Sequence, residues 1–101
     1  ALVDVIAAID QAELAELSLA SLAALAGLGR YQLIRAFQTA TGLTPHAYLL
    51  NARVNRARQC LRQGLPLAEV AYKLGFADQS HFQRVFKAHA GTTPGRYRLM
   101  R

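Results

Sequence analysis

Tryptophan is absent from this sequence and cysteine occurs once, at Cys60, so an internal disulfide is excluded and nothing indicates an oxidising compartment. We therefore expect a cytoplasmic protein. No apolar run approaches the roughly 20 residues that a membrane-spanning helix needs, and no basic segment followed by an apolar one opens the chain. We expect no membrane partner. Because Ala1 lies inside a helical pattern, we also expect the chain to be an excised domain of a longer protein.

The sequence also lacks the patterns of common catalytic and metal sites. It has no Cys-x-x-Cys pair, no His-Glu-x-x-His motif and no glycine-rich phosphate loop, and its histidines, His46, His81 and His89, are scattered. Ser80 and His81 are neighbours, but adjacent positions of a helix point apart and do not pair a nucleophile with a base. We expect no catalysis, no cofactor and no bound metal. An enzyme is the alternative, which a metal assay of the purified protein would test.

Acidic residues are scarce after residue 16. Four of the six acidic side chains fall in the first sixteen positions, which leaves two acidic residues against all twelve basic ones in residues 17–101. Ten of those twelve are arginine, whose planar donor fork fits phosphates and guanine edges. We therefore expect a polyanion as partner, and nucleic acid is the commonest one. The alternative is that the basic residues serve solubility alone. The separation of acidic from basic residues along the chain makes this alternative less favoured.

No stretch alternates apolar and polar residues over more than a few positions, so we expect no strand. Helical periodicity, with Ser18 and Asp78 as capping residues and Thr-Pro pairs at two helix starts, predicts an all-α fold of seven helices. The expected helices span about 3–15, 19–26, 30–41, 45–63 and 66–74, then one that begins after Asp78 and a short one that begins at residue 94. With 52% apolar residues in 101, the chain can bury a core as one domain or as two very small ones.

The stretch from Leu74 to Lys87 predicts a sharp turn followed by a short helix. Gly75 can take the positive φ that ends the preceding helix, and Asp78 can cap the next one. Helical spacing separates an apolar side of the helix from a polar and basic side. The apolar side contains Phe82, Val85, Phe86 and His89, and the polar side contains Ser80, Arg84 and Lys87 with Gln83 at its edge. Helix-turn-helix proteins enter the DNA major groove with this geometry, and a solvated surface helix is the alternative.

Residues 19–48 repeat in residues 67–97. The offset is 48 as far as Leu28, which matches Phe76, and 49 from Leu33 onward, because the second copy has one extra residue in between. The matching pairs include Leu22 with Val70, Gly27 with Gly75, Phe37 with Phe86, Gly42 with Gly91, Thr44 with Thr93 and Tyr48 with Tyr97. A structural duplication alone would keep these. Arg35 also matches Arg84, although both lie on the outward side of their helix where packing makes no demand, so the repeat predicts one chemical feature presented twice.

A long helix of about 19 residues, on the order of 28 Å, connects the two copies. Its expected buried stripe is Leu50, Val54, Ala57 and Leu61, with Arg53, Arg56, Arg58 and Arg62 spread round the rest. We therefore expect a first helix-turn-helix unit at 1–44, a linker helix at 45–64 and a second unit at 65–101. The linker is close to the roughly 34 Å of one DNA turn, so two recognition helices joined by it could enter successive major grooves.

Two motifs of the second unit are specific: Leu67-Ala-Glu-Val-Ala-Tyr-Lys-Leu-Gly-Phe-Ala-Asp-Gln-Ser-His-Phe-Gln-Arg-Val-Phe-Lys, and then Gly91-Thr-Thr-Pro-Gly-Arg-Tyr-Arg. With the two units and the Arg-bearing connector, they closely resemble the DNA-binding domain of the AraC/XylS family of bacterial transcription regulators. The resemblance covers essentially the whole chain. It implies a seven-helix, two-unit fold that binds asymmetric duplex-DNA sites as a single chain. It also implies a separate domain for ligand sensing and dimerisation, commonly before this one, and activation more often than repression.

The resemblance implies that the third helix of each unit reads bases. By position, the base-reading residues are Tyr31, Ile34, Arg35 and Gln38 in the first unit and Gln79, Ser80, Gln83 and Arg84 in the second. The two arginines suit guanine, the three glutamines suit adenine or a phosphate, and Ile34 could touch a thymine methyl. The expected phosphate contacts are Arg30, Arg53, Lys73, His81, Lys87 and Arg96, with N–H groups at helix starts. Gly29 stands where relatives often carry a Ser or Thr cap, so the helix at Arg30 could begin differently.

Two other binding functions are alternatives. Tyr31 and Ile34, exposed together, could form the docking patch of a protein-interaction module, and the acidic first helix could face a partner domain or RNA polymerase. Such docking would not exclude DNA binding. RNA binding is less favoured, because aromatic stacking platforms and a sheet are missing. We expect a sequence-specific, non-catalytic duplex-DNA-binding domain of a transcription regulator.

Overall fold

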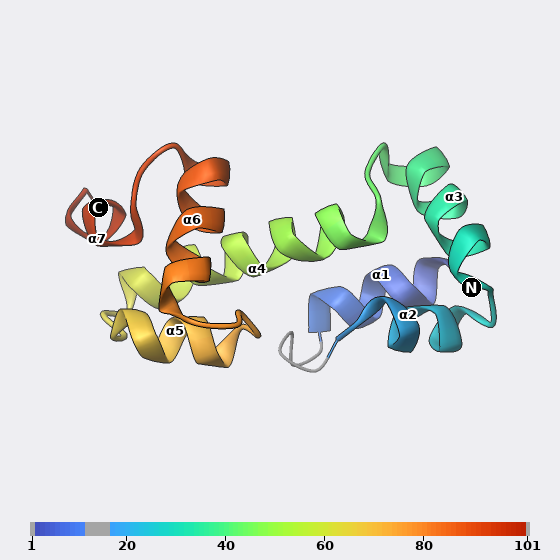
Figure 1. The fold of residues 1–101 in the computed structure, drawn as a ribbon, viewed down its shortest axis with the longest axis horizontal. Coiled ribbons are helices and arrows are strands. Elements are labelled where there is room, and N and C mark those ends of the chain that lie inside the picture. Colours follow the sequence, from blue (N-terminus) through green and yellow to red (C-terminus); the bar gives the residue numbers. More distant parts are fainter. Residues whose placement is uncertain (1, 12–16, 101) are drawn as a thin grey trace. The chain divides into compact units, whose positions relative to one another are not determined.

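The computed structural model describes residues 2–11 and 17–100, and this part of the chain is all-α, as predicted (Figure 1). Its helices are α1 (Leu2–Gln11), α2 (Leu19–Ala26), α3 (Arg30–Thr41), α4 (Pro45–Arg62), α5 (Leu67–Lys73), α6 (Gln79–Ala90) and α7 (Pro94–Leu99). No strand occurs in these residues. The last positions expected for the first helix, 12–15, lie outside the described residues. Within the described ranges, no helix combines the length and apolar character of a membrane span.

Side-chain caps fix where α2 and α6 begin. The Ser21 N–H donates to the Ser18 Oγ at 3.1 Å, and the Ser18 N–H donates to the Ser21 Oγ at 2.8 Å. At α6, the His81 N–H donates to the Asp78 carboxylate at 2.7 Å. Each cap gives a partner to N–H groups that a helix start leaves unpaired. The two capping residues expected from the sequence are therefore confirmed.

The chain divides into two compact units, Ala1–Leu50 and Asn51–Arg101, and the boundary falls inside α4. In the first unit α2 packs on both α1 and α3, and in the second α6 packs on both α5 and α7. Within each unit the third helix, α3 or α6, stands across the helix before it (Figure 1). The first core contains Val5, Ile9, Leu22, Ala23, Leu33, Phe37 and Leu49. The second contains Val54, Ala57, Cys60, Leu61, Val70, Ala71, Leu74, Phe76, Phe82 and Phe86.

The internal repeat recurs in the backbone of the turns. Gly27 ends α2 with φ 69°, and its match, Gly75, has φ 86° after α5. The next residue donates in the same way in both units, from the Leu28 N–H to the Ala23 carbonyl at 3.1 Å and from the Phe76 N–H to the Ala71 carbonyl at 3.0 Å. Both turns need a left-handed residue that glycine adopts at little steric cost.

Matching aromatic pairs close each unit. The Phe37 and Tyr48 rings meet edge to face with centroids 5.5 Å apart and planes at 68°. The Phe86 and Tyr97 rings do the same at 5.5 Å and 71°. Since edge-to-face packing is a favoured arrangement for aromatic rings, each pair ties the third helix of its unit to the helix that follows.

Several side chains differ in burial from the sides predicted for them. In α4 the buried leucine is Leu49, while Leu50 is half-buried. Near the ends of α3 and α6, Ala40 and His89 are exposed although their helical phase is apolar. Helical phase alone therefore does not determine burial at these positions. Arg53 differs in the opposite direction, and its burial bears on the functional surface described next.

Candidate nucleic-acid interface

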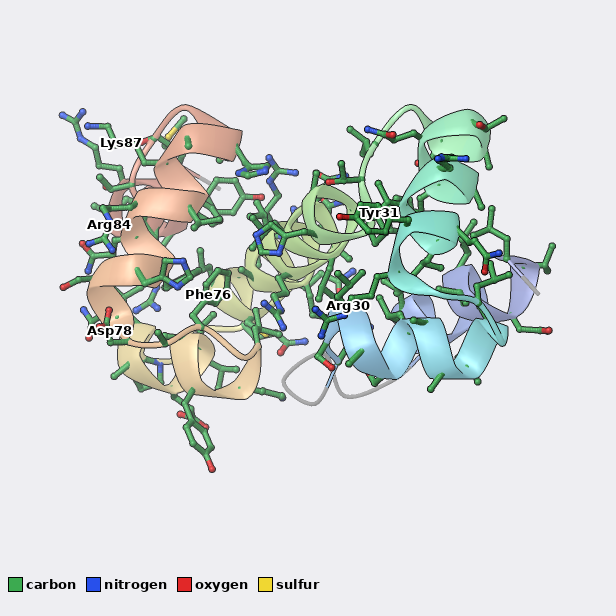
Figure 2. The ribbon with its side chains drawn as sticks, turned by 45° about the vertical axis from the view of Figure 1, so that its right-hand side comes forward. Arg30, Tyr31, Phe76, Asp78, Arg84 and Lys87 are labelled. Atoms are coloured by element: carbon green, nitrogen blue, oxygen red, sulfur yellow. The ribbon has the colours of Figure 1, made fainter. Side chains whose placement is uncertain are left out.

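The outer side of α6 is polar and basic. Phe82 and Phe86 are fully buried, and they fix which side of the helix faces solvent. The predicted base-reading residues of this helix, together with Lys87, share the opposite side: Gln79, Ser80, Arg84 and Lys87 are exposed and Gln83 is half-buried. Figure 2 shows Arg84 and Lys87 projecting outward from α6, with Phe76 on its inner side. Helix α6 has no acidic residue of its own, so its outer side carries positive charge only.

The outer side of α3 is organised in the same way but has a different composition. Leu33 and Phe37 are fully buried, while Tyr31 is 81% exposed (labelled in Figure 2). The other predicted reading residues lie on this outer side: Arg35 and Gln38 are exposed and Ile34 is half-buried. Helix α3 also has no acidic residue. Each unit therefore brings its predicted base-reading residues together on one helix.

Gln32 compensates for the missing cap side chain at Gly29. The Gly29 N–H donates to the Gln32 Oε1 at 2.9 Å, which is the second half of a capping box. Helix α3 begins at Arg30, as the sequence predicted. Arg30 is exposed in the first turn, so the glycine leaves the helix start unchanged and Arg30 free to meet solvent.

Phe76 connects the turn before α6 to the core of the second unit. Its ring centroid lies 5.1 Å from that of Phe82 and 5.5 Å from the ring of His81. The Ala77 N–H donates to the His81 Nδ1 at 3.4 Å. Because Nδ1 accepts in this arrangement, the neutral ring carries its proton on Nε2, where it can serve as a donor. His81 is half-buried, so it supports the turn as well as standing among the predicted phosphate contacts.

Arg53 does not lie on the open surface that the sequence predicted for it. Its side chain is 9% exposed, and its guanidinium carbon lies 6.0 Å from the centroid of the Phe76 ring. Burial lowers the pKa of this guanidinium from its usual value by desolvation. The prediction that Arg53 is exposed was wrong, because a long side chain at the edge of the buried stripe folds over an aromatic face instead of extending into water. Such burial does not favour a phosphate contact.

The other predicted phosphate residues remain accessible. Arg30, Lys73, Lys87 and Arg96 are exposed. In α7, however, the neighbouring Arg98 is half-buried and donates to the Leu65 carbonyl, so it holds α7 to the loop before α5. The Arg62 guanidinium likewise donates to the Tyr97 hydroxyl at 3.2 Å. The sequence separates the solvated arginine of α7 from the structural one only by helical phase, and a helix of six residues gives a weak phase.

The described part of the chain offers no metal-binding arrangement: no three His, Cys, Asp or Glu side chains come together there. Cys60 is buried in the core of the second unit and is a free cysteine.

Comparison with known proteins identifies this arrangement. A family model described as a helix-turn-helix domain matches residues 22–100. The crystal structure of a transcriptional regulator from Chromobacterium violaceum, with an AraC-type DNA-binding domain, is 32% identical and covers 97% of this chain and 88% of its own, with a TM-score of 0.88. The chain belongs to the AraC/XylS family. The DNA-binding domain of the global transcriptional factor AdpA, solved in complex with a target DNA, has a TM-score of 0.91 at 28% identity, and the match covers 97% of this chain and 89% of the AdpA chain.

Curated relatives of this chain are longer than the chain itself. The transcriptional regulator MtrA of Neisseria gonorrhoeae is 35% identical over 72 residues, which cover 70% of this chain and 24% of MtrA. The probable transcriptional regulator LumQ of Photobacterium leiognathi is 36% identical over 73 residues, which cover 71% of this chain and 29% of LumQ. The chain thus spans less than a third of their lengths. It is an AraC-type DNA-binding domain and not an enzyme, which sets the enzymatic alternative aside.

Proposed function

We propose that this AraC-type domain recognises a specific duplex sequence as a single chain by placing α3 and α6 in successive major grooves. One observation carries the proposal: two units with matching turn glycines and aromatic pairs present an exposed arginine at the same position of their third helix, Arg35 and Arg84. Packing does not require either arginine. A bidentate arginine is the commonest reader of guanine in the major groove.

The length of α4 supports two sites about one turn apart. The helix runs from Pro45 to Arg62, 18 residues, which at 1.5 Å per residue is about 27 Å. One turn of DNA is about 34 Å. As a linker between the proposed units at 1–44 and 65–101, α4 would suit neighbouring grooves better than sites two turns apart.

The remaining exposed residues divide into two proposed roles. Gln38, Gln79 and Gln83 suit adenine, and Ser80 can donate to or accept from any base edge. Arg30, Lys73, Lys87 and Arg96 would neutralise backbone phosphates, with the His81 Nε2 as a further donor. The AdpA domain, which has the same fold, was solved with a target DNA, and this supports a duplex as the ligand.

The full-length protein is proposed to be a cytoplasmic transcription regulator with further partners. The curated relatives are named as regulators and are several times longer than the matched part. Two solved neighbours are described as C-terminal domains of response regulators, one from Fusobacterium nucleatum and one from Geobacillus stearothermophilus. We therefore propose a separate effector-binding or dimerisation domain, and RNA polymerase as a partner.

Selection of bound duplexes from a random pool tests the proposed function. We expect two half-sites whose centres lie about one turn apart, each with a guanine.

Arg84→Ala should flatten the base preference at one or two base pairs of one half-site, and Arg35→Ala should do so in the other half-site. Each guanine contact is worth about 1–3 kcal/mol of base discrimination.

Arg58→Ala is the matched control. It removes the same charge from α4, which is neither of the reading helices, and there the guanidinium donates to the Asn55 amide oxygen at 2.7 Å. It should leave every base preference unchanged. A uniform loss of affinity in Arg84→Ala would make this residue a phosphate contact, and equal affinity for single strands would overturn the duplex proposal.

A further inference from the structure

We infer that the two half-sites differ in chemistry: α3 reads thymine methyl groups beside its guanine, whereas α6 reads its half-site through hydrogen bonds. This inference rests on the proposed function and specifies the DNA sequence that it recognises. It follows from comparing the two helices position by position on a scaffold that the chain repeats.

The two reading helices share their arginine and differ at its neighbours. The offset of 49 that pairs Arg35 with Arg84 also pairs Tyr31 with Ser80 and Ile34 with Gln83. The same offset relates the buried Leu33 and Phe37 to the buried Phe82 and Phe86, so the helices have the same phase. At equivalent places α3 therefore offers an aromatic ring and a branched alkyl group, and α6 offers a hydroxyl and an amide.

The apolar side chains of α3 are accessible where a recognition helix meets bases. Tyr31 is 81% exposed in the first turn, and residues near the N-terminus of such a helix contact base edges. Ile34 is half-buried one turn further along, on the same side. Residues three apart on a helix are surface neighbours, so Tyr31 and Ile34 form one apolar strip next to Arg35.

Only thymine presents an apolar group in the major groove, its C5 methyl. Apart from the small C5–H of cytosine, the other bases present hydrogen-bond donors and acceptors there, which the alkyl group of Ile34 cannot satisfy. Covering such an edge with apolar surface would remove its water without replacing the hydrogen bonds, which costs free energy. The strip therefore favours thymine and discriminates against bases that need a polar partner, while Ser80 and Gln83 can pair with polar edges.

Deoxyuridine tests this inference, because it removes the methyl of thymine and keeps the hydrogen-bonding edge. The probe is the duplex obtained by selection, with half-sites assigned by the preferences that Arg35→Ala and Arg84→Ala flatten. Replacing thymine by deoxyuridine in the α3 half-site should weaken binding about three- to fivefold for each contacted methyl, as expected for losing one buried methyl group. The same replacement in the α6 half-site should change the affinity less than twofold.

Protein variants test the same contacts from the side of the protein. Ile34→Ala and Tyr31→Ala should bind more weakly and lose most of the response to deoxyuridine, whereas Gln83→Ala should keep the full response. Tyr31 is so exposed that its replacement leaves the core intact, and circular dichroism checks that α3 persists. Absence of thymine from the α3 half-site, or an equal response in both half-sites, would overturn the inference while duplex recognition stands. Loss of all sequence preference in the wild-type selection would overturn the proposed function instead.

Discussion

Asp78 caps the first turn of α6 through one short hydrogen bond, in which the backbone N–H of His81 donates to the Asp78 carboxylate at 2.7 Å. Asp78→Ala should therefore lower the free energy of unfolding by about 1 kcal/mol, the usual cost of losing an N-cap. Urea denaturation followed by circular dichroism measures the change. Asp78→Asn keeps an acceptor oxygen and should stay within a few tenths of a kcal/mol of the wild type. An equal loss in both variants would mean that charge, and not the cap, stabilises the turn.

Capping residues were predictable because they act on the N–H groups of the same turn. Ser18 and Asp78 needed no knowledge of the rest of the chain. Arg53 was not predictable in this way, since its place depends on Phe76, 23 positions later in the sequence. A residue type that is usually solvated becomes buried when an aromatic face lies within reach of its side chain. Of the predicted site, the burial of Arg53 is what sequence reasoning missed.

At the scale of the element, two glycines at the end of α6 and in α7 should respond in opposite ways to replacement by alanine. One replacement should lower the free energy of unfolding and the other should raise it. Gly91 ends α6 with φ +79°, a conformation that disfavours any side chain, although the added methyl would meet no atom within 4 Å. Gly91→Ala should lower the free energy of unfolding by about 1 kcal/mol. Gly95 lies inside α7, also has open space around it and has no positive φ. Gly95→Ala should raise the same quantity by about 0.5 kcal/mol.

Thermal unfolding of the two variants measures this contrast. Because the added methyl group is the same and both sites are open, the difference in sign isolates the backbone conformation at Gly91. Similar shifts of both variants in one direction would contradict the left-handed end of α6.

The bounds of the helices could be predicted from local sequence signals. The buried side of each helix could be predicted only in part. A glycine at a helix end and a capping serine at a helix start are properties of a few neighbouring residues, so the approximate bounds predicted for α2 and α3 agree with the structure. The choice between Leu49 and Leu50 depends on which partner helix covers α4, and adjacent leucines give no sign of it. Tertiary packing decides such positions.

For the whole molecule, the net charge of +6 predicts a strong dependence of DNA binding on salt. Arg30, Lys73, Lys87 and Arg96 are each proposed to neutralise one phosphate. The logarithm of the affinity should then fall with the logarithm of the salt concentration with a slope of about −4. This corresponds to a loss of affinity of roughly a hundredfold between about 50 and about 200 mM salt. Fluorescence anisotropy over a salt series measures the slope. Lys73→Ala should make the slope shallower by about one, and Arg53→Met should leave it unchanged. Affinity independent of salt would contradict the proposed phosphate contacts.

The repeated aromatic pairs, Phe37 with Tyr48 and Phe86 with Tyr97, involve none of the side chains proposed to read bases. Folding and target choice are thus assigned to separate sets of residues in each unit. Mutations on the outer side of α3 could accumulate without weakening the core, while α6 keeps its own preference. Under the proposed function, a lineage carrying this domain could move from one promoter to another by altering half of its target at a time, with the unaltered unit retaining partial binding at every intermediate step.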